Sequence, residues 1–88
     1  ITPHVAMSPL KAAVQVAHAS QLALGTLATS ADAPRDALDR WRAAGFDVRL
    51  IRPDARQWAG LAASALVVVR DAGFTEIPPG TRTALALW

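Results

Sequence analysis

The feature that most constrains the fold is the segment of residues 9–27, which holds almost no polar side chain. Ser8 followed by Pro9 is a typical helix start, with Ser at the N-cap and Pro at the first helical position. Because apolar residues occupy nearly every position around this helix, we expect it to be long and largely buried. A helix of this kind requires a second layer of secondary structure against which to pack.

Shorter helices alternate with apolar runs along the rest of the chain. The pattern predicts a helix over residues 34–44 ended by Gly45, a strand over 46–52, a short helix over 55–63 capped by Asp54, a buried strand over 66–69 and a last strand over 81–88. Trp41 and Trp58 fall at core positions of their helices. Residues 1–6 contain Pro3 and supply at most the stub of a fourth strand. Helices that separate strands indicate an α/β layer fold.

Composition excludes several classes of protein. The 88 residues are 52% apolar and 18% charged, which is the opposite of a disordered chain. The absence of Cys excludes a disulfide framework, a thiolate zinc site and a cysteine nucleophile. Since no run reaches about 18 apolar residues, no membrane span is expected. The net charge of +2 is not by itself the footprint of a nucleic-acid-binding protein.

The first candidate site is a polar stripe on the long helix. Lys11, Gln15 and His18 are spaced i, i+4, i+7, which places them within roughly 60° of one another on one helix face. The first turn of a helix, with its free N–H groups and a Lys, is suited to an anion. Alternatively, Lys11 extends to water and Gln15 lies at the helix edge, and His18 is a hydrogen-bonded histidine of the core.

The second candidate site is the loop that follows the buried strand, residues 71–83. In open α/β sheets, ligands bind beyond the carboxyl ends of strands, and Asp71 stands at such an end. Alternatively, Asp71 is an ordinary turn residue. Phe74 is the exception in this loop, because it is apolar where loops are usually polar. Two His residues without ligand spacing do not predict a metal site.

Two motifs together resemble the type II peptidyl-tRNA hydrolase family. The first is Met7-Ser-Pro-Leu-Lys-Ala-Ala-Val-Gln-Val-Ala-His-Ala19, and the second is Asp71-Ala-Gly-Phe-Thr-Glu-Ile-Pro-Pro-Gly-Thr-Arg-Thr83. The resemblance implies a three-layer α/β/α fold with a small mixed sheet. It also implies that residues 1–88 form a single domain that lacks the family's first strand and its C-terminal helix.

The same resemblance implies an enzyme that hydrolyses the ester bond between peptide and tRNA, without metal or other cofactor. Carried over by position, the catalytic set is Lys11, His18, Asp71, Thr75 and Thr83, and the binding set is Gln15, Phe74 and Glu76. The implied substrate is peptidyl-tRNA, the implied location is the cytoplasm, and the abundance of Ala and Arg suggests a GC-rich bacterial genome.

The chain also departs from the family pattern. Phe74 stands where the family usually has Arg, and Glu76 stands where it usually has Gln. Both changes remove a positive or neutral polar side chain where a polyanion is expected to dock. This matters because RNA affinity depends heavily on phosphate contacts. An alternative is therefore a non-catalytic module that binds a protein or an RNA. A third interpretation is a structural fragment that another chain or a removed segment completes, and a homodimer is left open.

Overall fold

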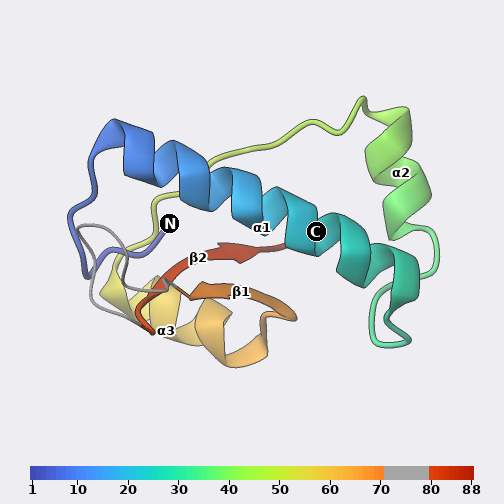
Figure 1. Ribbon diagram of the computed structural model, residues 1–88. Helices are drawn as coiled ribbons and strands as arrows, with labels where there is room; N and C mark the ends of the chain where they lie inside the picture. The colour runs from blue at the N-terminus through green and yellow to red at the C-terminus, as the bar shows by residue number, and fades with distance from the viewer. Residues whose placement is uncertain (71–79) are drawn as a thin grey trace.

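The structure, a computed structural model, describes residues 1–70 and 80–88. In these residues it contains three helices and one small antiparallel sheet of two strands, which is compatible with a small α/β protein. The elements are α1 (Pro9–Thr29), α2 (Ala37–Ala43), α3 (Ala55–Ser64), β1 (Val67–Arg70) and β2 (Arg82–Ala86). Figure 1 shows α1 lying across one side of the β1–β2 hairpin, with α3 on the other side.

The long first helix is confirmed, but its predicted burial is wrong. Ser8 caps the helix, since its side chain accepts a hydrogen bond from the Lys11 N–H at 3.2 Å. Only Gln15, Ala19 and Ala23 are buried, whereas Leu10 is 77% exposed. The physical reason is the narrowness of the sheet: a two-stranded hairpin covers one face of a helix and leaves the others open.

The core lies where the middle of α1 meets the hairpin. Ala19 of α1 packs with Val69 of β1 and Ala84 of β2. The small Ala side chains at these contacts let the helix approach the strands closely. The apparently thin, Ala-rich composition thus supports one tight helix–hairpin contact.

The last strand departs from strict alternation at Thr83. Val69 pairs with Ala84 whereas Arg70 pairs with Arg82, so the register shifts and Thr83 is an additional residue on β2. Thr83 and Ala84 are consequently both buried. A regular strand would place every second side chain of residues 81–88 on one face, but a bulge re-aims the side chain at its position here.

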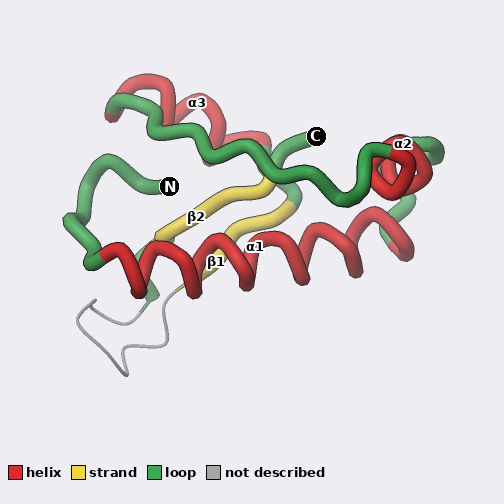
Figure 2. The backbone as a smooth tube through the Cα atoms, turned by 90° about the horizontal axis from the view of Figure 1, so that it is seen from above, coloured by secondary structure: helices red, strands yellow, loops and turns green. Residues whose placement is uncertain are grey.

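The strand predicted over residues 46–52 is not formed. Gly45 and Phe46 both have positive φ (73° and 57°), and the Phe46 N–H donates to the Trp41 carbonyl at 2.9 Å, which closes the end of α2. Beyond this turn, residues 47–54 run from α2 to α3 without strand or helix (Figure 2). An apolar alternation alone does not make a strand without a ladder of hydrogen bonds to a neighbouring backbone.

The two tryptophans expected in the core behave differently. Trp58 on α3 is 3% exposed, so its prediction is confirmed. Trp41 on α2 is only half-buried; its ring meets that of Phe46 edge to face at 5.0 Å, and its Nε1–H donates to the Asp47 carbonyl at 2.9 Å. Trp41 therefore fixes the turn after α2.

Candidate active site

The three side chains of the polar stripe on α1 differ in solvent exposure. Because the helix is continuous, Lys11, Gln15 and His18 lie on one side of it, as their spacing predicts. Gln15 is 2% exposed, Lys11 is half-buried and His18 is exposed. The alternative of His18 as a core histidine is therefore wrong, whereas Gln15 faces the hairpin one turn before Ala19.

Thr83 is the other fully buried polar residue of this region. It is 0% exposed, and its hydroxyl donates to the Val69 carbonyl at 3.4 Å. Gln15 and Thr83 are the largest fully buried side chains among the described residues. Burying a polar side chain costs free energy unless the side chain is hydrogen-bonded. Two such side chains in a small core therefore make this region a candidate functional site.

These side chains gather at one end of the molecule. The N-terminal half of α1 and the start of β2 lie at the same end in both Figure 1 and Figure 2. The chain leaves β1 at Arg70 and re-enters the described part at Gly80 at this end, where Arg70 donates to the Gly80 carbonyl at 3.4 Å. We call Lys11, Gln15 and Thr83 the α1–β2 cluster.

The N-terminal segment fixes the backbone of the cluster, a feature that the sequence reasoning did not single out. The Thr2 N–H donates to the Thr83 carbonyl at 2.9 Å, and Thr2 is itself buried. The Thr2 hydroxyl accepts from the His4 N–H at 3.2 Å. Residues 1–6 form no strand, but this single backbone hydrogen bond from Thr2 holds the carbonyl of Thr83.

Four predicted site residues lie outside the described residues. These are Asp71, Phe74, Thr75 and Glu76. The structure therefore places only the predicted residues of α1 and β2, and the predicted residues of 71–79 are not described.

Charges on the described surface are mostly paired or exposed. Arg40 pairs with Asp36 at 3.2 Å, and Arg42 pairs with Asp39 at the same distance. Both pairs are exposed, so each contributes little to stability. One pKa is displaced: burial, with the charge of Arg52 adding to it, lowers the pKa of the Ile1 amino group below 8.0.

Neither metal ligation nor membrane insertion finds support in the described ranges, 1–70 and 80–88. There, no group of three His, Cys, Asp or Glu side chains is placed to hold a metal ion. No helix among these residues is both long and apolar enough to cross a bilayer.

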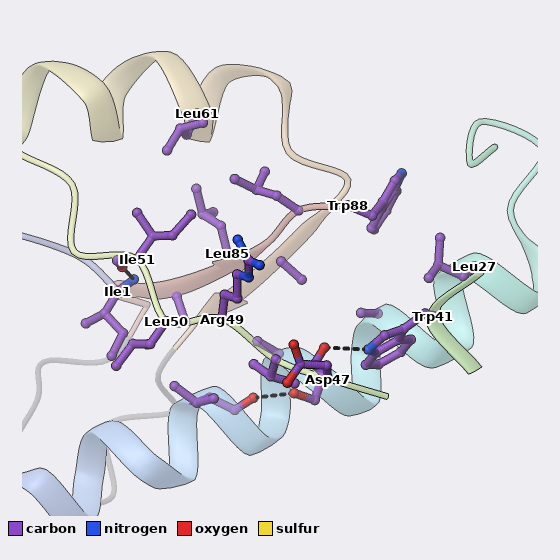
Figure 3. Close-up of a pocket in the computed structure, with 18 of the residues that line it drawn as sticks. Ile1, Leu27, Trp41, Asp47, Arg49, Leu50, Ile51, Leu61, Leu85 and Trp88 are labelled. Carbon is purple, nitrogen blue, oxygen red and sulfur yellow. Dashed lines mark hydrogen bonds between the residues drawn. The ribbon is translucent and has the colours of Figure 1, made fainter. Parts of the chain in front are cut away.

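A hollow with mostly apolar walls is separate from the α1–β2 cluster. It has a volume of about 550 Å³ and lies between β2 and residues 47–51, with none of Lys11, Gln15 and Thr83 in its walls. Figure 3 shows Leu50, Ile51, Leu85 and Trp88 around it. The signal for this groove in the sequence is indirect, namely the apolar alternation of residues 46–52.

Comparison with known proteins assigns the chain to a class of hydrolases. The family described as peptidyl-tRNA hydrolase PTH2 matches residues 3–88, nearly the whole chain. The chain therefore belongs to the peptidyl-tRNA hydrolase PTH2 family, as the two motifs predict. No curated protein and no solved structure matches it significantly.

Proposed function

We propose that the protein hydrolyses the ester bond that joins a peptide to tRNA and releases free tRNA. The observation that carries the proposal is the α1–β2 cluster: two buried polar side chains, Gln15 and Thr83, and a half-buried Lys11, at the end of the fold from which residues 71–79 depart. Membership of the peptidyl-tRNA hydrolase family supports the reaction.

The reaction requires an oriented water and donors for the developing oxyanion. Asp71 orients or deprotonates the water, which attacks the ester carbonyl carbon. The C–O bond to the ribose then breaks, and the ribose oxygen takes up a proton. Lys11 stabilises the oxyanion or contacts a tRNA phosphate, and its position in the first turn of α1 suits an anion because the helix dipole acts there in the same direction.

The remaining residues have supporting roles in the proposal. The hydroxyls of Thr75 and Thr83 hold the water or the carbonyl oxygen, and His18 orients Asp71 or Lys11. The exposure of His18 fits a residue that meets substrate or solvent. Gln15 supports the site from the buried side of α1, while Phe74 and Glu76 contact the substrate.

The proposal includes the family's architecture and setting. We take residues 1–88 as one domain with the three-layer α/β/α arrangement, of which α1, the hairpin and α3 supply parts. The substrate is peptidyl-tRNA and the setting is the cytoplasm, where translation produces it. No metal or other cofactor takes part in this scheme.

Release of tRNA from an N-acetylaminoacyl-tRNA tests the proposal. Lys11→Ala and Asp71→Asn are each expected to reduce the rate at least about a hundredfold, the scale of one acid–base or oxyanion group. Arg42→Ala and Asp32→Asn remove the same charges from exposed positions on or before α2 and serve as matched controls. Near-normal turnover in both site variants contradicts the proposal. Tight tRNA binding without turnover in the unmodified chain supports the non-catalytic alternative instead.

A further inference from the structure

Two arginines stand opposite each other at the end of the hairpin. Arg70 ends β1 and Arg82 begins β2, and they are Cα partners across the antiparallel register. Residues paired in this way project their side chains to the same face of the sheet, with Cβ atoms about 5 Å apart. Val69 packs against α1, so the alternation along β1 directs Arg70 to the other face of the hairpin. Both arginines are exposed, and we call them the arginine pair.

The arginine pair has no acidic partner in the part of the chain that the structure describes. There, the ion pairs lie at α2, and neither Arg70 nor Arg82 takes part in one. The Arg70 guanidinium donates to the Gly80 carbonyl at 3.4 Å, which orients the group but leaves its charge uncompensated. Like charges directly opposite each other on two strands destabilise the pairing. An anion bound between the two guanidinium groups removes that repulsion.

The acidic side chains of residues 1–70 and 80–88 lie away from the pair. Asp54 caps α3. The others belong to α2 or its flanking segments, which Figure 1 shows at the far end of α1, and they are Asp32, Asp36, Asp39 and Asp47. By contrast, the end of the molecule that carries the arginine pair also holds Lys11, in the first turn of α1. Cations gathered at one end of a protein attract polyanions.

We propose that the arginine pair holds one backbone phosphate of the tRNA while the ester lies at the α1–β2 cluster. This inference rests on the proposed function and adds the path of the RNA strand. A phosphodiester has two free oxygens, and each can accept hydrogen bonds from one guanidinium, whose planar fork suits phosphate. Arg82 directly precedes Thr83, so the pair begins one residue from the proposed catalytic hydroxyl. The ester oxygen belongs to the terminal ribose, whose own 5′-phosphate is the nearest charge of the strand.

A phosphate contact of this kind lies outside the reacting bond, so the pair binds substrate and transition state alike. Loss of such a contact raises KM and leaves kcat unchanged. Phosphate contacts also release counterions, so each lost arginine lowers the salt dependence of binding. The contact is independent of base sequence, because phosphates carry no sequence information.

Binding of a fluorescently labelled, deacylated tRNA tests the proposal, with anisotropy measured between about 50 and 200 mM salt. The test variant is Arg70→Gln/Arg82→Gln. The matched control is Arg35→Gln/Arg49→Gln, which removes the same charge from two exposed positions. We expect the test variant to raise Kd at least about tenfold and to lower the slope of log Kd against log salt by about 1.5, whereas the control raises Kd less than about threefold.

Equal effects of the two double variants overturn the proposal, because the arginine pair is then neutralised within the chain, as by Asp71 or Glu76. Absence of tRNA binding by the unmodified chain overturns it as well. Thermal unfolding separates binding from folding: since the pair is a like-charge contact, the test variant without RNA is expected to keep a Tm at least as high as that of the unmodified chain. A Tm lower by several degrees assigns the arginines to the fold and contradicts the proposal.

Competition identifies the anion. Unlabelled tRNA is expected to displace the labelled tRNA at a concentration at least about tenfold lower than polyglutamate or inorganic phosphate, because a strand makes several phosphate contacts at once. Equal displacement by polyglutamate indicates an acidic protein partner, and equal displacement by inorganic phosphate indicates a free-phosphate site; either result overturns the choice of RNA.

Failure of this inference is distinguishable from failure of the proposed function. If the chain binds tRNA through the arginine pair but releases no tRNA from N-acetylaminoacyl-tRNA, the contact stands and the hydrolysis fails. If the chain hydrolyses this substrate and the test variant keeps the same KM, the hydrolysis stands and the contact fails. A KM raised at least about tenfold with unchanged kcat supports both.

Discussion

The variants Thr83→Val and Thr83→Ser separate the structural contribution of the Thr83 side chain from its proposed catalytic contribution. Val removes the hydroxyl, and Ser removes the methyl group. The side chain is 0% exposed, and its hydroxyl donates to the Val69 carbonyl at 3.4 Å. That distance is long for a bond between oxygens, so its net contribution lies at the low end, about 0.5 kcal/mol. Val replaces the hydroxyl by a methyl group, and burial of that methyl group, worth about 0.8 kcal/mol, is similar in size to the lost hydrogen bond.

The two variants are therefore expected to rank oppositely in stability and in activity. Thr83→Val changes the free energy of unfolding by less than about 1 kcal/mol. Thr83→Ser keeps the hydroxyl but removes a buried methyl group, which costs about 1 kcal/mol. If the hydroxyl takes part in hydrolysis, Val lowers the rate about a hundredfold, whereas Ser retains most of it.

Urea unfolding, monitored by tryptophan fluorescence, gives the free energies, and single-turnover release of tRNA gives the rates. Full activity of Thr83→Val contradicts a catalytic contribution of the hydroxyl and leaves Thr83 as a packing residue of the bulge. An inactive but folded Thr83→Ser contradicts the reasoning in a different way, because it assigns the requirement to the methyl group.

Two further predictions concern stability away from the α1–β2 cluster. Asp54→Ala removes a capping box, in which Asp54 accepts from the Gln57 N–H at 2.8 Å and donates to the Gln57 side chain at 3.0 Å, so we expect a loss of about 1 kcal/mol in urea unfolding. Asp54→Asn is expected to retain most of the stability that Ala loses, because Asn is also a good N-cap residue, and an equal loss in Asn and Ala refutes the cap. The pKa of the Ile1 amino group is lower in the folded state than the 8.0 of the unfolded chain. Between these two pKa values the unfolded chain binds more protons, so the free energy of unfolding increases as pH rises through this range and decreases as pH falls. Acetylation of the amino group is expected to remove this component of the Tm difference between pH 6 and pH 9, and an unchanged difference contradicts it.

Local signals in the sequence predicted the helices well. Ser8-Pro9 starts α1, and Asp54 caps α3, since both depend on hydrogen bonds between residues three positions apart. The buried run 66–69 became β1, and Trp58 became a core residue. These features need only near neighbours along the chain, so a pattern of residue types is sufficient to predict them.

Features that depend on distant neighbours were predicted less well. Residues 46–52 alternate like a strand but do not form one, because strand formation needs a hydrogen-bonding partner that alternation does not supply. The exposure of His18 and of Leu10 likewise depended on the width of the sheet under α1. The spacing of Lys11 and Gln15 placed them on one side of α1, but it could not show which of them is buried.

The sequence by itself determined the family and the capped starts of α1 and α3, and it suggested the residues of the proposed chemistry, because motifs and caps are local and depend on residue type. Only the tertiary structure decided that Thr83 is an additional, buried residue in β2, that the Thr2 N–H holds its carbonyl, and that an apolar groove separates β2 from residues 47–52. Each of these depends on the distance between backbones far apart in the sequence, which hydrophobic patterning does not specify.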